Sequence, residues 1–234
     1  MLVVENLTKA FGSAKALDGI NLSVERGQFV GVIGRSGAGK STLLRSLNRF
    51  AEPSAGRVLW DGQDVTALTG RALRDWRRRC AMIFQQFNLI GRLDVLDNVL
   101  MGRLTHTPFW RSTTKLWSRE DRLIGMAALE QMGIGALASQ RADHLSGGQQ
   151  QRVAICRALL QEPEIVLADE PTAELDPETR ELVVSMLIEQ ARRGAIVVIA
   201  THDPEVAQRC DRRLHLVDGR VAELSETAAT SSRS

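Results

Sequence analysis

Glycines, a lysine and a serine stand together at residues 34–41, in the order Gly-Arg-Ser-Gly-Ala-Gly-Lys-Ser. An apolar run at 29–33 precedes them as a buried strand would, and residues 42–47 follow with the period of a helix. Glycines at such a turn let successive backbone N–H groups point at phosphate oxygens, and the dipole of the next helix adds partial positive charge. We therefore predict a phosphate cradle in which Lys40 reaches the β- and γ-phosphates and the Ser41 hydroxyl binds Mg²⁺.

An acidic pair, Asp169-Glu170, ends a second strand pattern at 165–168. At the carboxyl end of a core strand, the first carboxylate is suited to bind Mg²⁺, and the second is suited to act as a base that orients a water molecule. His202 follows a third strand pattern, 195–200, and would reach the same sheet edge, where its ring could bond a γ-phosphate. Together these side chains predict a site that directs water at a terminal phosphate.

Two further polar features accompany these groups. Gln85 ends the buried strand pattern 80–84, at the place where open parallel sheets bind ligands. Residues 145–149, Leu-Ser-Gly-Gly-Gln, open a helical pattern in which Ser146 is a natural N-cap and the two glycines leave the first backbone N–H groups bare. The sequence thus contains a second helix end able to bind an anion, although one nucleotide does not obviously need two.

The chain of 234 residues suits one α/β domain with an insertion, or one large and one small subdomain. Hydrophobic residues at 44% and charged residues at 25% are ordinary for a globular protein, and a net charge of +2 does not demand nucleic acid. The longest apolar runs have the length of strands and no leader-like segment opens the chain, so we expect a cytosolic protein. Cys80, Cys156 and Cys210 lie far apart among apolar neighbours, which predicts reduced packing residues.

Short alternating strands before the cradle predict an antiparallel layer with glycine turns. These strands are 2–7, 20–24 and Phe29-Val30. Phe11 ends the first strand, and its ring could stack on an adenine or belong to the core. Hairpins are predicted across Asp61-Gly62 and Asp218-Gly219. The basic run 71–79 could contact an anionic surface, but its pattern favours a solvated helix face.

Residues 87 to about 144 change character, because helical patterns at 95–104 and 119–132 follow each other with no strand pattern between them. The polar loop 105–117 carries three aromatic residues, which could cover the subdomain's own small core or form an exposed patch for a partner. We expect four parts along the chain. They are a first part of the core at 1–86, a helical subdomain with its last helix at 87–160, a second part of the core at 161–224, and a disordered tail at 225–234.

Taken together, these motifs resemble those of the ATP-binding subunits of ABC transporters, over residues 1 to about 224. The most specific element is the order and spacing of residues 145–149 upstream of Asp169-Glu170. The resemblance implies an α/β fold with a P-loop NTPase core, in which a mixed or parallel sheet has flanking helices. It also implies an N-terminal antiparallel β layer and an inserted helical subdomain.

The resemblance implies a role for each motif residue. Those expected to bind ATP are Phe11, Gly34, Ser36, Gly37, Ala38, Gly39, Lys40, Ser41, Thr42, Ser146, Gly147, Gly148 and Gln149, and those expected to bind Mg²⁺ are Ser41, Gln85 and Asp169. Glu170 matches the catalytic glutamate, His202 the switch histidine, and Gln85 the glutamine that senses Mg²⁺ and the γ-phosphate. Two departures are mild, since Phe11 stands where most members have tyrosine and Ala173 where serine is common.

In the family, each ATP lies between the P-loop of one subunit and the signature of the other, which would explain two anion-binding helix ends. The resemblance therefore implies a head-to-tail homodimer with two-fold symmetry. It further implies a peripheral protein on the cytoplasmic face of the inner membrane, whose 87–144 region contacts integral permease subunits. A solute-binding protein is an indirect partner, and no nucleic-acid partner is expected.

Within the family, the chain is most similar to the ATP-binding subunits of phosphonate importers. The segments that carry this similarity are 44–50, 71–74, 82–90 and 109–112. The resemblance implies an ATPase that powers import of phosphonates or a related oxyanion. Two alternatives stay open, namely another ABC system for lipoprotein release or export, and a soluble ABC ATPase that acts on nucleic acid. The latter usually carries a coiled-coil or zinc insertion or two tandem cassettes, and this chain has one cassette and no cysteine cluster.

Overall fold

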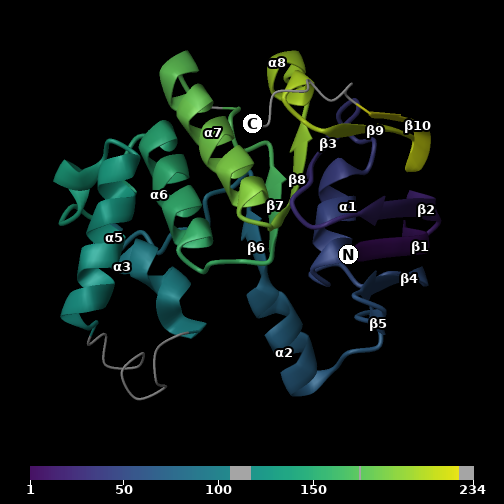
Figure 1. Cartoon of the computed structure of the whole chain (residues 1–234), viewed down its shortest axis with the longest axis horizontal. Coiled ribbons are helices and arrows are strands. Elements are labelled where there is room, and N and C mark those ends of the chain that lie inside the picture. The colour runs from purple at the N-terminus through teal and green to yellow at the C-terminus, as the bar shows by residue number, and fades with distance from the viewer. Residues whose placement is uncertain (106–116, 174, 227–234) are drawn as a thin grey trace.

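The computed structural model describes residues 1–105, 117–173 and 175–226, whose strands form two sheets (Figure 1). The smaller sheet is antiparallel and has the strand order β2-β1-β4-β5. Its strands are β1 (Leu2–Phe11), β2 (Ala14–Val24), β4 (Ala55–Trp60) and β5 (Gln63–Asp64). Strands β4 and β5 form the hairpin predicted across Asp61-Gly62.

The larger sheet has the strand order β10-β9-β3-β8-β7-β6 and is parallel except for β10. Its strands are β3 (Phe29–Ile33), β6 (Cys80–Ile83), β7 (Ile165–Asp169), β8 (Ile196–Thr201), β9 (Arg212–Val217) and β10 (Arg220–Glu226). All residues of β6, β7 and β8 are buried, which is why these strands read as unbroken apolar runs. This mixed sheet with flanking helices confirms the predicted α/β fold.

One predicted strand, Phe29-Val30, lies in a different sheet from the one expected. The sequence assigns it to the antiparallel layer, but it belongs to β3, which runs parallel to β8 and β9. Neighbouring side chains of a strand point to opposite faces, and here Phe29 and Val30 fill two separate cores, each at most 2% exposed. A strand buried on both faces belongs inside a sheet covered by helices, and the prediction was wrong on this point.

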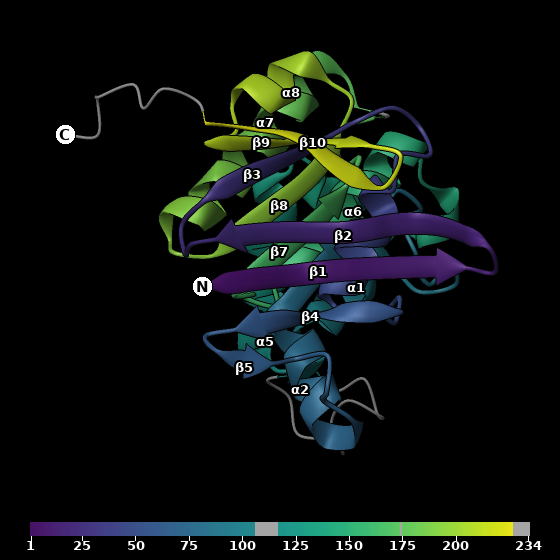
Figure 2. The same ribbon diagram turned by 90° about the vertical axis from the view of Figure 1, so that its right-hand side faces the viewer.

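Two hydrophobic cores flank the larger sheet. On one face, α1 (Lys40–Leu47) lies between this sheet and the antiparallel one, behind β1 and β2 in Figure 2. On the other face pack α6 (Gly147–Leu159) and α7 (Pro177–Arg192). Two further helices are α2 (Gly70–Arg79), a basic helix with only Trp76 buried, and α8 (Pro204–Gln208). The three free cysteines are packed into these two cores, as predicted.

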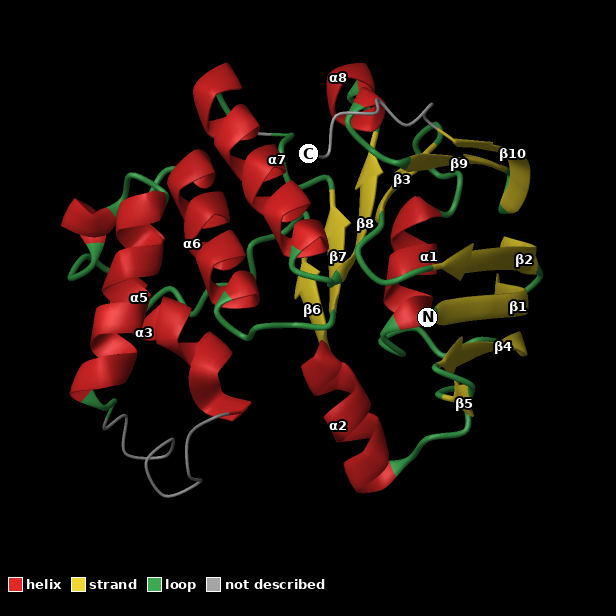
Figure 3. Cartoon of the chain, in the orientation of Figure 1, coloured by secondary structure: helices red, strands yellow, loops and turns green. Residues whose placement is uncertain are grey.

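Between β6 and β7, the described residues form helices and no strand, and these helices stand as a group beside the sheets in Figure 3. They are α3 (Val95–Leu100), α5 (Arg119–Gln131), α6 and the 3₁₀ helices η1 (Met101–Thr105), η2 (Gly135–Leu137) and η3 (Ala142–His144). The helical patterns predicted at 95–104 and 119–132 are thereby confirmed. In the described parts of the chain, no helix has both the length and the apolar character needed to cross a bilayer.

Trp117 is the one aromatic residue of the loop 105–117 that the structure describes. Its ring packs half-buried against the core of the helical group, and its indole N–H donates to a carboxylate oxygen of Asp97 at 3.0 Å. The core interpretation is therefore confirmed for Trp117. Phe109 and Trp110 lie outside the described residues, as do residues 227–234 of the predicted tail.

The segment that leaves β6 is fastened to α3 by Asn98, whose side chain is fully buried. Its carbonyl oxygen accepts the N–H of Ile90 at 2.8 Å, and its amide donates to the carbonyl oxygens of Ile90 at 3.1 Å and Asp94 at 2.9 Å. One side chain thus supplies the hydrogen bonds that this irregular backbone cannot make within a helix or sheet. Because the same segment begins at Gln85, Asn98 ties the end of β6 to the helical group.

We expect Asn98→Ala to lower the free energy of unfolding by about 2 kcal/mol, because it leaves a buried N–H and buried carbonyl oxygens without partners. Urea denaturation followed by circular dichroism measures this difference. Gln131→Ala is the control, since Gln131 is exposed on α5 and its loss should change stability by less than about 0.5 kcal/mol. Equal stabilities of the two variants would contradict the structural role of Asn98.

Candidate functional site

The loop 34–39 connects β3 to α1 and packs closely against its neighbours. A Cβ on Gly34 would lie 2.4 Å from the carbonyl oxygen of Leu216, and one on Gly39 would lie 2.4 Å from that of Ala16. Gly39 also has a φ of +104°, in the region that favours glycine. A larger side chain at either glycine would push the loop outward. The first N–H groups of α1, which starts at Lys40, have no partner within the helix, and this is what lets a helix N-terminus bind an anion.

A cavity of about 570 Å³ opens at this loop, within the size range of small-molecule sites. Among its lining residues are the predicted Gly34, Ser36, Gly37, Ala38, Gly39, Lys40, Ser41, Thr42, Gln85, Asp169, Glu170 and His202. Arg35, Ala173 and Ala16 also line it, and the sequence did not single out Ala16. The structure therefore brings the predicted groups from four separate segments of the chain to one cavity.

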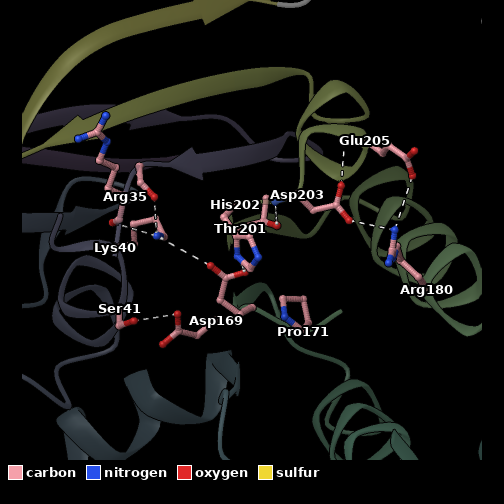
Figure 4. Close-up of polar contacts among 12 residues, drawn as sticks. Arg35, Lys40, Ser41, Asp169, Pro171, Arg180, Thr201, His202, Asp203 and Glu205 are labelled. Atoms are coloured by element: carbon pink, nitrogen blue, oxygen red, sulfur yellow. Dashed lines mark hydrogen bonds and ion pairs between the residues drawn. The ribbon is translucent and has the colours of Figure 1, made fainter. Parts of the chain in front are cut away.

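The side chain of Lys40 contacts the loop 34–39 that precedes it. Its ammonium group donates to the carbonyl oxygens of Gly34 at 2.7 Å and Arg35 at 3.3 Å, and it lies 3.8 Å from Oε1 of Glu170 (Figure 4). The side chains of Lys40 and Glu170 are only 10% and 13% exposed, so little water screens their attraction. Lys40 thus places a positive charge between the loop and the carboxylate.

Ser41 and Asp169 meet at the floor of the cavity, where the Ser41 hydroxyl donates to Oδ1 of Asp169 at 2.9 Å (Figure 4). Asp169 is 1% exposed, and its Oδ2 atom is buried without a hydrogen-bond partner among the described residues. Burial raises the pKa of this carboxyl above its usual value, because the charged form loses water. A buried carboxylate with a free oxygen beside a hydroxyl is a donor set that fits Mg²⁺.

Glu170 and His202 form a pair at the open side of the cavity. Nδ1 of His202 lies 2.9 Å from Oε2 of Glu170, and the ring is largely exposed. Glu170 has a φ of +49°, which is uncommon for a residue with a side chain. Its N–H donates to the carbonyl oxygen of Ala200 on β8 at 2.9 Å. The carboxylate is thereby placed between Lys40 and His202, where it can accept a proton from water.

The segment that carries His202 is anchored from α7. Asp203 caps the start of α8, and its Oδ2 atom lies 3.3 Å from the guanidinium of Arg180 (Figure 4). The same guanidinium lies 3.6 Å from Glu205. The hydroxyl of Thr201 accepts the N–H of Asp203 at 3.0 Å. These contacts on both sides of His202 hold its backbone, while the ring, which is paired with Glu170, stays exposed and can meet a ligand.

Residues 146–149 lie apart from the cavity. Ser146 caps α6 as predicted, since its hydroxyl accepts the N–H of Gln149 at 3.4 Å and its own N–H donates to Oε1 of Gln149 at 2.9 Å. None of these four residues, with Gly147 and Gly148 between them, lines the cavity. One chain therefore assembles the P-loop, Gln85, both carboxylates and His202, and leaves the second anion-binding helix end elsewhere.

Phe11 is 57% exposed at the end of β1, so the core interpretation of this residue is wrong. It lines a second cavity of about 420 Å³ together with Lys9, Arg45 and Phe50. Thr42 lines both cavities, so the two are neighbours. The ammonium group of Lys9 lies 4.7 Å from the centre of the Phe11 ring. Stacking of this exposed ring on an adenine stays a prediction.

One polar residue that bears on the site was missed from the sequence. Gln151, in α6, is 2% exposed and donates its amide to the backbone of the segment after β7. A signal was present, because Gln151 shares a helix face with Ala154, Ile155 and Ala158, which are all buried. A polar side chain on an apolar face must find a partner inside the protein.

Comparison with known proteins gives consistent results. The sequence profile of the ABC transporter family matches residues 17–173. The "Phosphonates import ATP-binding protein PhnC" of Rhodopseudomonas palustris BisB5 is 57% identical, over 98% of this chain and 88% of that protein. The protein of the same name from Bradyrhizobium diazoefficiens is 57% identical, over 94% of this chain and 83% of that protein.

Solved structures of bacterial cassettes have the same fold. The dimeric ABC transporter cassette MJ0796 aligns with a TM-score of 0.89 and 34% identity, over 97% of this chain and 99% of that chain. Its dimer in a post-hydrolysis state, bound to ADP and Pi, aligns with a TM-score of 0.87 over the same shares of both chains.

We expect Asp169→Asn to raise the free energy of unfolding in EDTA at pH 8, because the amide replaces a buried charge. Since burial raises the pKa of Asp169 in the folded state, this group favours folding below the pKa of the unfolded chain and loses that contribution as the pH rises. The advantage of the variant should therefore be larger at pH 8 than at pH 4.5. Urea denaturation at both pH values measures it.

The same variant should respond less to nucleotide. Mg²⁺ and ATP at a hundredfold excess over their dissociation constant should stabilise the unsubstituted protein by about 2.7 kcal/mol. Asp169→Asn should show a smaller gain. A variant that is less stable than the unsubstituted protein in EDTA, or equally stabilised by Mg²⁺ and ATP, would contradict the assignment of Asp169.

Proposed function

The chain belongs to the ABC transporter family, and we propose that it is the ATP-hydrolysing subunit that powers an importer of phosphonates. The catalytic part of this proposal rests on one observation, namely that the P-loop, Asp169, Glu170 and His202 line the same cavity. The transport part is supported by relatives at 57% identity that are named as phosphonate import proteins. Their names favour import over lipoprotein release, export or an activity on nucleic acid.

In this proposal the loop 34–39 and Lys40 hold the phosphates of ATP, and Phe11 stacks on the adenine. Ser41, Asp169 and Gln85 would hold Mg²⁺, which when bound offsets the charge of the phosphate oxygens. Ser41 and Asp169 are already in contact, and Gln85 lines the same cavity. The phosphates would lie near the start of α1, where the helix dipole favours negative charge.

Glu170 is the proposed general base. Its carboxylate would accept a proton from the attacking water, while Lys40 at 3.8 Å keeps a positive charge beside it. His202, whose ring nitrogen is 2.9 Å from the carboxylate, would orient Glu170 and bond the terminal phosphate through its exposed ring. A positioned base of this kind contributes about a hundredfold to ten-thousandfold in rate.

Two copies of the chain would complete each site. Ser146, Gly147, Gly148 and Gln149 form a capped helix start that lies outside the cavity of their own chain. A head-to-tail pair would bring this start to the ATP held by the other copy, where its free N–H groups suit a phosphate. The dimeric cassettes of the same fold support such a pair.

The remaining partners follow from the family. We place the protein at the cytoplasmic face of the inner membrane as a peripheral subunit, with residues 87–144 against integral permease subunits. Closure and opening of the dimer would then drive the permease between two states, and a solute-binding protein would deliver the phosphonate. The chain itself need not contact the solute.

Transport is tested by complementation. A Bradyrhizobium diazoefficiens strain that lacks its own PhnC should regain uptake of a radiolabelled alkylphosphonate when it expresses this chain. Glu170→Gln is the matched control, which should bind ATP but restore no uptake, because hydrolysis falls by about a hundredfold or more. If the purified chain hydrolyses ATP but restores no uptake in a strain that the native protein rescues, the phosphonate assignment is wrong and the ATPase assignment stands.

Dimerisation is tested in the Glu170→Gln background by light scattering. ATP should convert this variant to a dimer, and a further Ser146→Arg should abolish the dimer, because the larger cationic side chain blocks the helix start. Ser118→Arg is the control, since Ser118 caps α5 with the same capping box. Loss of either cap costs about 1 kcal/mol, so only the effect on dimerisation should separate the two variants. Dimerisation of the Ser146 variant would refute the shared site.

A further inference from the structure

Gln151 lies one turn inside α6, the helix whose start carries Ser146, Gly147 and Gly148. It is 2% exposed, and its neighbours on the buried face of the helix are apolar. A primary amide in such surroundings carries two donors and one acceptor that water cannot satisfy. The hydrogen-bond partners of Gln151 therefore show which segment of the chain α6 is attached to.

The amide of Gln151 binds the backbone on which Glu170 is mounted. Nε2 donates to the carbonyl oxygen of Pro171 and lies 3.4 Å from that of Glu170. These two consecutive carbonyl groups belong to the segment that leaves β7 at the cavity. From the other side, the N–H of Glu170 is held by Ala200 on β8 at 2.9 Å. The peptide units around Glu170 are thus fixed between the sheet and α6.

The backbone of Glu170 needs such support. Its φ of +49° is a left-handed conformation that costs a residue with a Cβ about 1 kcal/mol or more and persists when its surroundings impose it. From this backbone the carboxylate reaches 2.9 Å from His202 and 3.8 Å from Lys40. A displacement of about 1 Å at a reacting group can reduce a rate by about a hundredfold.

We propose that Gln151 is a positioning residue that sets the place of the Glu170 carboxylate and ties it to α6. This inference rests on the proposed role of Glu170. Through Gln151, the helix whose start is proposed to meet the ATP of the partner subunit is joined to the glutamate that acts on the ATP of its own subunit. Hydrolysis of ATP by Glu170 at one site then depends on how α6 of the same subunit is placed at the other site.

Gln151→Met tests the proposal, because methionine has similar length and no donor. We expect kcat for ATP hydrolysis to fall at least tenfold, with KM and the affinity for a fluorescent ATP analogue changed less than twofold. Gln161→Met is the matched control, since Gln161 follows α6 and also donates its amide to a backbone carbonyl, that of Arg78. Its kcat should stay within twofold of the unsubstituted protein.

A double-mutant cycle separates positioning from a structural role. In the Glu170→Gln background, Gln151→Met should leave the residual hydrolysis rate and ATP-dependent dimerisation unchanged, because the carboxylate it positions is gone. A tenfold loss of the residual hydrolysis rate in the Glu170→Gln background would overturn the proposal. An unchanged kcat when Gln151→Met is the only substitution would overturn it as well. Gln151→Leu provides a second donor-free variant if the methionine variant is unstable, and the same outcomes apply to it.

The cycle also distinguishes this inference from the proposed function. If Glu170→Gln alone hydrolyses ATP at the unsubstituted rate, the proposed role of Glu170 fails. If Glu170→Gln is inactive but Gln151→Met is fully active, only the positioning role of Gln151 fails.

Discussion

Strands β3, β7 and β8 run parallel in one sheet, so their carboxyl ends meet at a single edge. The register pairs Ile33 with Thr201 and Asp169 with Ala200. The residues that follow these pairs are the P-loop, Glu170 and His202. Because a slip of one residue would turn every side chain of a strand to the opposite face, the site depends on this register. The register in turn depends on the two cores that cover both faces of the sheet.

The sequence predicted those parts of the fold and site that rest on local chemistry. The cap at Ser146, the turn at Asp61-Gly62 and the glycine loop before Lys40 each owe their form to neighbours within a few residues. The sheet edge could be predicted as well, since strands buried on both faces are recognisable as apolar runs.

The parts that the sequence did not reveal depend on contacts between distant segments. Phe29-Val30 has the apolar character of either sheet, and only the packing of β8 and β9 beside it decides which one. Phe11 could be an exposed or a buried ring, because a single aromatic residue carries no periodicity. The carbonyl partners of Gln151 stand 19 and 20 residues farther along the chain, and no spacing rule connects a helix face with the backbone of a loop.

The helix α6 links the segments that leave two strands of the sheet. Near its start Gln151 binds the backbone after β7, and near its end Arg157 donates to the carbonyl oxygens of Phe87 at 3.0 Å and Asn88 at 2.7 Å, after β6. The second of these segments begins at Gln85 and is held to α3 by Asn98. A displacement of α6 would therefore reach both the Glu170 carboxylate and the segment that begins at Gln85. A movement of α6 would then shift two walls of the cavity at once.

The loop 34–39 owes its shape to contacts within the chain. Gly34 and Gly39 are packed against backbone oxygens, and Lys40 donates to two carbonyl groups of the loop itself. A receptor preorganised in this way loses little conformational entropy when its ligand arrives. Little of the free energy of nucleotide binding is then needed to order the loop. The remainder is available to bring two subunits together. Close packing behind a few glycines thus leaves more of the free energy of ATP binding for the proposed closure of the dimer.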